Sequence, residues 1–112
     1  GISIGVIDIR WIKPLDTRVL NNLSTPRLFT VEENTLIGGL GSAILEHFND
    51  NLLTEDTKIF RLGIPDVFAQ HASREEQLEM FSLSVDELTQ KVIDIFEQTQ
   101  QIPRNITNLS HF

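Results

Sequence analysis

Runs of β-branched and other apolar residues in three short stretches predict three strands. The first run occupies Ile2–Ile9, where Gly, Ser and Asp separate the isoleucines and the valine. A run of this kind is typical of a buried strand, and we expect it to end near Trp11. A turn should follow, because Pro14 disfavours helical backbone in the residue before it. Residues 27–33 and 58–62 are the second and third predicted strands.

Hydrophobic residues recur at helical spacing in four other stretches, which predicts four helices. The first is short and takes Asp16 or Thr17 as its N-cap. The second covers residues 43–48, and the third begins with a capping box at residues 73–76 and ends near Phe81. The last helix has hydrophobic residues at positions i, i+4, i+7 and i+8, namely Leu88, Val92, Ile95 and Phe96.

Strands that alternate with helices predict an α/β fold, in three α/β/α layers around a mostly parallel sheet. Three strands are few for this class, so either the pattern misses further strands or, as we expect, the domain is truncated at its N-terminal edge. The domain should occupy residues 1–97. Residues 98–112 are rich in Gln, Asn and Thr, and we expect them to form a loose tail.

Composition and charge exclude several classes of function. The chain has 112 residues, enough for one domain, and its 16 acidic against 9 basic residues give a formal charge of -7. No basic cluster is present to bind a phosphate backbone, so we expect no nucleic-acid partner. Because there is no Cys, disulfides, thiolate nucleophiles and Cys-based metal sites are excluded. No apolar stretch approaches the roughly 20 residues that cross a bilayer, so we also expect no membrane span.

A glycine-rich loop follows the second predicted strand and precedes a helix, at the edge where open α/β sheets bind ligands. The glycines either permit a tight turn or place backbone N–H groups around an anion, and their spacing leaves both readings open. The adjacent carboxylates would repel an anion and favour a neighbouring domain or a positively charged partner. The candidate contact residues are Glu32, Glu33, Asn34, Gly38, Gly39, Gly41 and Ser42.

We predict no catalytic residue and no metal site. Glu32 and Glu33 are adjacent on a strand, so their side chains should point to opposite faces and cannot form a catalytic pair. The three histidines, His47, His71 and His111, lack the spacing of metal ligands on one element. His71 stands just before a predicted helix, where it is a candidate for an exposed contact.

Three segments, in order, resemble the C-terminal domain family of transketolases. Residues 6–16 read VIDIRWIKPLD and are similar to the family's first strand and turn. Residues 30–34 read TVEEN, and residues 38–43 read GGLGSA, as in the strand and loop that follow. Residues 61–76 carry the G-x-P-D-x-F phrase, a His and the S-R-E-E start of a helix, and they most resemble the 1-deoxy-D-xylulose-5-phosphate synthases. The chain differs from the family at two places: Ala72 stands where a Gly usually follows the His, and residues 81–83 stand where the family usually has a Gly-Leu pair.

The resemblance implies the third domain of a thiamine diphosphate- and Mg-dependent enzyme that condenses pyruvate with glyceraldehyde 3-phosphate for isoprenoid, thiamine and pyridoxal synthesis. In that family a Gly-Asp-Gly…Asn motif of the first domain holds the cofactor, and the second domain supplies an activating Glu. Neither motif is present here, so we expect the chain to bind no cofactor, to be inactive alone, and to contact the other domains and a dimer mate. Such synthases occur in the bacterial cytoplasm and in plastids, and we expect the former.

Two alternatives remain open. The strand and glycine-loop phrases are shared with the β subunits of 2-oxo acid dehydrogenases, whose C-terminal domain docks an acyltransferase core. A free-standing α/β module that binds a small anion through the same loop is the other alternative.

Overall fold

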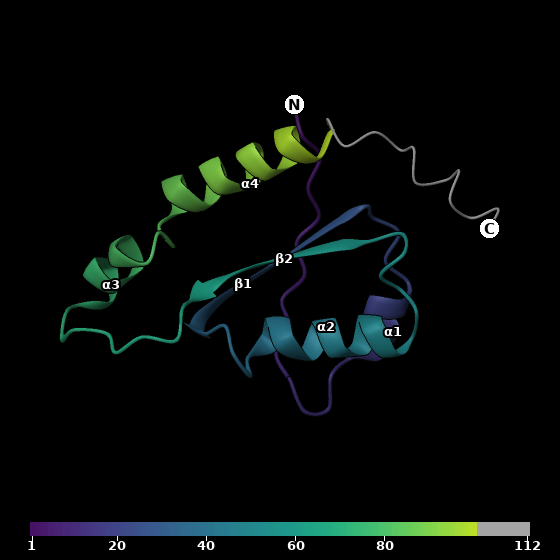
Figure 1. Cartoon of the computed structure of the whole chain (residues 1–112), viewed down its shortest axis with the longest axis horizontal. Coiled ribbons are helices and arrows are strands. Elements are labelled where there is room, and N and C mark those ends of the chain that lie inside the picture. The colour runs from purple at the N-terminus through teal and green to yellow at the C-terminus, as the bar shows by residue number, and fades with distance from the viewer. Residues whose placement is uncertain (101–112) are drawn as a thin grey trace. The chain divides into compact units, whose positions relative to one another are not determined.

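A computed structural model describes residues 1–100 of the chain as two compact units, which divide between Gln70 and His71. The first unit contains two helices and two strands, and the second contains two helices (Figure 1). In chain order the elements are α1 (Thr17–Asn21), β1 (Arg27–Thr35), α2 (Leu40–Asp50), β2 (Lys58–Ile64), α3 (Arg74–Met80) and α4 (Val85–Gln100).

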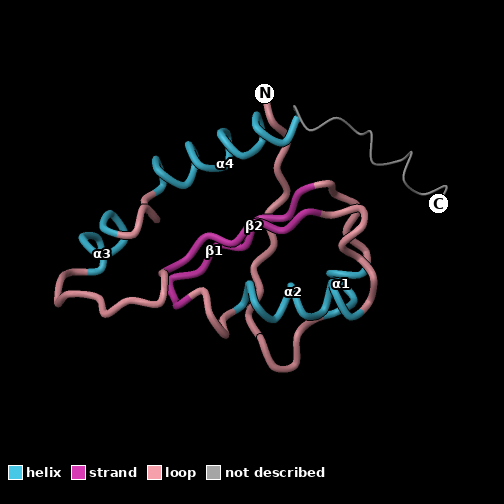
Figure 2. Tube along the Cα trace, in the orientation of Figure 1, coloured by secondary structure: helices cyan, strands magenta, loops and turns pink. Residues whose placement is uncertain are grey.

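The two strands are parallel and are connected through α2, which makes a β-α-β unit (Figure 2). The register runs from the pair Arg27 and Lys58 to the pair Val31 and Leu62, and an irregularity follows before Thr35 meets Ile64. Parallel neighbours need a crossover connection, and a helix of this length supplies it. The prediction of an α/β domain with a parallel sheet is confirmed.

The core of the first unit lies between its helices and one face of the sheet. Leu20 of α1 and Ile44 and Phe48 of α2 are buried together. Partly buried hydrophobic residues surround them: Leu15, Leu23, Leu28, Leu40, Leu53 and Ile59. Phe29 and Phe60, which are paired in the register, stack with ring centroids 5.2 Å apart. Helix α2 buries the side that its hydrophobic spacing predicts.

Residues 1–11 form no strand, so the prediction of a strand in the first run of β-branched residues is wrong for this structure. Ile4 and Val6 are 63% and 91% exposed, and the sheet of the described residues contains β1 and β2 alone. A run of β-branched residues favours extended backbone, but a strand also needs a neighbour that accepts its hydrogen bonds. The expected turn at Ile12–Leu15 is present.

Helix α1 begins at one of its two predicted caps, whereas α2 begins at Leu40, three residues before the predicted start. The Asp16 side chain accepts a hydrogen bond from the Arg18 N–H and caps α1. Helices α2 and α3 both end in a Schellman motif, in which Leu52 and Ser82 adopt left-handed backbone with φ values of 57° and 55°. The Leu83 N–H closes the second motif by donating to the Leu78 carbonyl oxygen at 2.7 Å. Ser82 therefore occupies a conformation that favours glycine.

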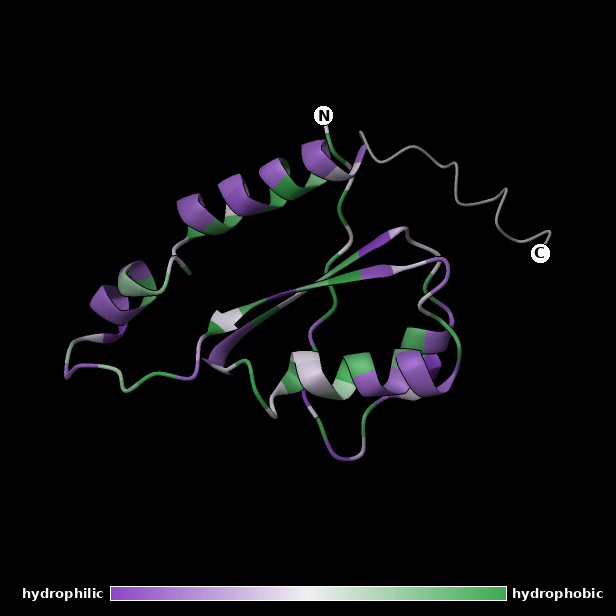
Figure 3. Ribbon diagram, viewed as in Figure 1, coloured by the Kyte–Doolittle hydropathy of each residue, from purple (hydrophilic) through white to green (hydrophobic). Residues whose placement is uncertain are grey.

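The second unit is built on two helices, α3 and α4. Ser73 and Glu76 form the predicted capping box of α3, and Ser84 donates a hydrogen bond to the Glu87 carboxylate at 2.7 Å at the start of α4. This hydrogen bond holds the pKa of Glu87 below its ordinary value. Helix α4 has a hydrophobic and a hydrophilic side (Figure 3) and continues to Gln100, past the expected domain end at residue 97. The rest of the expected tail lies outside the described residues.

Acidification is expected to weaken the first turn of α3. The Glu76 carboxylate accepts a hydrogen bond from the Ser73 N–H at 2.9 Å, and its hydrogen bonds with Ser73 lower the pKa of Glu76 below 4.5. Because the folded-state pKa is the lower one, this stabilisation is present above pH 4.5 and is lost as the pH falls through the folded-state value. The amide resonances of Ser73 and Glu76 should report that transition. Glu76→Gln should remove this pH transition, whereas the control Glu79→Gln, on the same helix, should preserve it. An unchanged transition in Glu76→Gln would contradict its assignment to the Glu76 carboxylate.

Candidate functional site: a glycine-rich loop closed by the chain's own carboxylate

Glu32 is the buried carboxylate of the predicted site. Along β1, Thr30 and Glu32 are buried whereas Val31 and Glu33 are exposed, as alternating strand residues require. The Glu32 carboxylate accepts hydrogen bonds from the backbone N–H groups of Leu40, at 2.9 Å, and Gly41, at 2.8 Å. It therefore caps α2, whose N-cap residue, Gly39, has no side chain to do so.

The glycines of the loop make room for this carboxylate. A Cβ atom on Gly39 would overlap the Glu32 Oε1 atom and lie 2.8 Å from the Thr35 carbonyl oxygen. A Cβ atom on Gly41 would lie 2.8 Å from both the Thr30 hydroxyl oxygen and the Arg61 Cδ atom. Gly38 has a φ of 75°, which favours glycine. The loop makes the tight turn of the first reading, and the Glu32 carboxylate of the same chain occupies the helix N-terminus.

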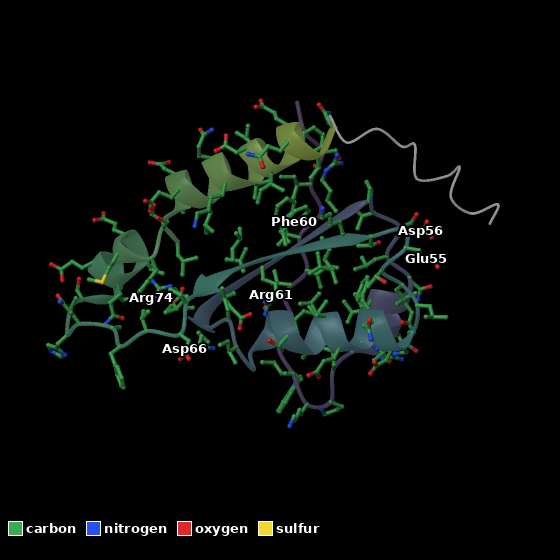
Figure 4. All side chains as sticks on the ribbon, viewed as in Figure 1. Glu55, Asp56, Phe60, Arg61, Asp66 and Arg74 are labelled. Carbon is green, nitrogen blue, oxygen red and sulfur yellow. The ribbon has the colours of Figure 1, made fainter. Side chains whose placement is uncertain are left out.

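Ser42 and Arg61 hold the other side of the loop. The Ser42 hydroxyl accepts a hydrogen bond from the Gly38 N–H at 3.1 Å and donates to the Leu36 carbonyl oxygen at 2.8 Å. The Arg61 Nη1 atom donates to the Leu36 carbonyl oxygen and to the Ser42 hydroxyl, both at 3.2 Å. Figure 4 shows Arg61 and its neighbour Phe60 on opposite sides of β2, with Arg61 on the side of α2. Side chains from β1, β2 and α2 thus fix one loop.

Arg61 is the residue of this network that the sequence analysis missed. It lies 19 residues from Ser42 and 25 from Leu36 along the chain, so no local spacing connects them. The only available signal was its place in the third predicted strand. The parallel register, which is seen in the structure and not in the sequence, sets Arg61 opposite Thr30.

The other candidate residues, Glu33, Asn34 and His71, are all exposed. Glu33 and Asn34 are exposed at the end of β1, beside the loop. His71 is exposed in the second unit, which is described separately from the loop. His47 connects α1 with α2, because its Nε2 atom lies 2.7 Å from the Asn21 Oδ1 atom and its Nδ1 atom 3.2 Å from the Asn51 amide nitrogen. His111 lies outside the described residues.

The side chains of Glu32, Ser42 and Arg61 are engaged in hydrogen bonds within the loop network. Within residues 1–100, no group of three or more His, Cys, Asp or Glu side chains could hold a metal ion. A cavity of about 520 Å³ lies near the N-terminal segment and α1; it is lined by Ile7, Trp11, Pro14 and Val19, among others, and includes none of the predicted site residues. In the same range, no helix is both long enough and apolar enough to cross a membrane.

The family profile described as the C-terminal domain of transketolase matches residues 1–88. The chain belongs to this family. Its curated relatives include 1-deoxy-D-xylulose-5-phosphate synthases from three bacteria. The chain is 35% identical to the Chlorobium phaeovibrioides enzyme over 82% of the chain, and 36% identical to the Chlamydia trachomatis enzyme over 92% of the chain. It is 39% identical to the Carboxydothermus hydrogenoformans enzyme over 88% of the chain. The chain spans 14% of the first relative and 16% of each of the other two.

Proposed function

We propose that the chain is the C-terminal domain of a 1-deoxy-D-xylulose-5-phosphate synthase. The observation that carries this proposal is the 35–39% identity to such synthases over 82–92% of the chain. The match to only 14–16% of each relative fits one domain of a larger enzyme. That enzyme would condense pyruvate with glyceraldehyde 3-phosphate and release carbon dioxide, with thiamine diphosphate and Mg as cofactors, in the bacterial cytoplasm.

The described residues do not fit the diphosphate or the Mg of this cofactor. The helix N-terminus that could bind a phosphate group donates its Leu40 and Gly41 N–H groups to the Glu32 carboxylate, and that negative charge would repel a second anion. The acidic side chains of residues 1–100 form no metal-binding group. These observations support a domain that leaves the cofactor to other parts of the enzyme and is inactive alone.

The role of the domain would be to pack against the other domains and the dimer mate. Glu33 and Asn34 are exposed beside the loop, where they can contact a neighbouring surface. In the full enzyme, Glu33→Ala is expected to weaken assembly more than it slows turnover, because the proposed role of Glu33 is to contact a neighbouring surface. Sedimentation velocity and steady-state kinetics on the same preparations measure both effects. Intact assembly with a collapse of kcat would contradict this role.

The proposal is tested by synthase assays on the full polypeptide that carries this chain. Formation of 1-deoxy-D-xylulose 5-phosphate from pyruvate and glyceraldehyde 3-phosphate, with no turnover by the chain alone, would support it. Upstream sequence without the Gly-Asp-Gly…Asn motif, and a separate subunit that carries the motif, would instead favour a 2-oxo acid dehydrogenase β subunit. A complete polypeptide without any such domain would favour a free-standing module.

A further inference from the structure

Helix α2 begins at a group of hydrogen-bond donors, one of which is unused. Two of the donors, the backbone N–H groups of Leu40 and Gly41, are taken by the Glu32 carboxylate. The third is the hydroxyl of Thr30, a residue that is 4% exposed; the hydroxyl has no hydrogen-bond partner among the described residues. It lies against the first turn of α2, because a Cβ atom on Gly41 would be 2.8 Å from the hydroxyl oxygen. A buried hydroxyl without a partner lowers stability, so its presence here calls for a physical reason.

Apart from Glu32, the groups around this turn are positive or neutral. Helix α2 has 11 residues, and its N-terminus carries the positive end of the helix dipole. The Arg61 Cδ atom is also 2.8 Å from the position of a Cβ atom on Gly41, and the Arg61 Nη1 atom donates only to uncharged oxygens, those of Leu36 and Ser42. Backbone N–H groups at a helix start, a hydroxyl and a guanidinium are donors that bind phosphate groups. The two oxygens of a carboxylate use the two N–H groups, whereas a tetrahedral anion has further oxygens for the hydroxyl.

We propose that the N-terminus of α2 is a phosphate-binding site that the chain's own Glu32 keeps closed. A phosphate group at this position would accept hydrogen bonds from the Leu40 and Gly41 N–H groups and from the Thr30 hydroxyl. Glu32 excludes it in two ways: the carboxylate is tethered to β1, which gives it a high effective concentration at the donors, and its charge repels a free anion. All of these groups belong to the first unit of the chain.

Titration of the chain with inorganic phosphate tests the site, with amide resonances as the readout and with chloride keeping the ionic strength constant. Glu32→Ala removes the closing carboxylate, and we expect it to bind phosphate at least about tenfold more tightly than the wild-type chain, with saturable shifts at Leu40 and Gly41. Where Glu32→Ala is partly unfolded, phosphate should restore the folded resonances, because a ligand of the folded state stabilises it, whereas chloride at equal ionic strength should not.

A second substitution tests the unused donor. Thr30→Val, added to Glu32→Ala, removes the hydroxyl at nearly constant volume and should weaken phosphate binding by about tenfold. Thr54→Val in the same background is the matched control, because Thr54 is an exposed threonine, and it should leave the phosphate affinity unchanged.

Each outcome decides a separate point. A folded Glu32→Ala chain whose Leu40 and Gly41 resonances do not respond to phosphate would overturn the site. Phosphate binding that Thr30→Val leaves unchanged would overturn the role of the hydroxyl and indicate an adventitious ion only. Equally tight binding by the wild-type chain at the same amides would overturn the closure by Glu32. None of these results depends on synthase activity, so a failure of this site and a failure of the proposed function are distinguishable.

Discussion

Phe48→Ala is expected to lower the free energy of unfolding by about 3–5 kcal/mol, the largest effect that we predict for a single substitution. Phe48 is 2% exposed and packs in the core with Leu20 and Ile44. Removing its ring leaves a cavity between α1, α2 and the sheet, where neighbouring side chains relax only in part. Helix α2 also supplies the start of the glycine-rich loop network, so its loss of packing should loosen that loop.

Urea unfolding followed by circular dichroism at 222 nm measures this effect. Where Phe48→Ala is too unstable to study, Phe48→Leu should give a smaller loss in the same direction. Leu52→Ala is the matched control, because Leu52 is a hydrophobic residue near the same helix end but is 79% exposed; it should change the free energy by less than about 0.5 kcal/mol. A loss of similar size in Leu52→Ala and Phe48→Ala would contradict the core described here.

Glu32→Gln is expected to destabilise the chain by about 2 kcal/mol, the second-largest effect. The carboxylate accepts two backbone N–H groups of α2, and Glu32 is 8% exposed. A glutamine of the same shape has one oxygen and one NH2 group, so an amide donor would face a backbone donor. The charge that complements the helix dipole would also be lost.

The same unfolding experiment measures the effect of Glu32→Gln, and amide hydrogen exchange locates it. Exchange should accelerate at Leu40 and Gly41, whose N–H groups lose their acceptor. Glu46→Gln is the control, because Glu46 is an exposed acidic residue on α2 and should leave both measurements near the wild-type values. Wild-type stability in Glu32→Gln would mean that the carboxylate does not cap α2.

The local chemistry of the helices could be predicted from the sequence because it involves residues a few positions apart. Asp16 caps α1 and the Ser73–Glu76 capping box begins α3, as expected from spacings of two and three residues. The strand of residues 2–9 was predicted wrongly on the same kind of local pattern. A helix satisfies its hydrogen bonds within its own segment, whereas a strand depends on a neighbour that a local pattern cannot supply.

The candidate site was predicted in its parts but not in its arrangement. Glu32, the loop glycines and Ser42 were all expected at one contact region, and the structure brings them together. Arg61 was missed because its hydrogen bonds reach across 19 and 25 residues. The sequence did not decide whether the glycine-rich loop is a tight turn or an anion site, since nothing in the glycine spacing shows which group meets the helix N-terminus.

The sequence by itself determined the α/β class, the N-terminal caps of α1 and α3, the absence of cysteine chemistry and the family to which the chain belongs. These follow from residue type, periodicity and motif order, which are properties of the chain alone. Only the tertiary structure decided that Glu32 occupies the N-terminus of α2 and that Arg61 supports the loop. Parallel pairing of β1 and β2 brings these residues together. Their contacts therefore depend on strand register and on the path of the chain through α2, neither of which a local sequence pattern contains.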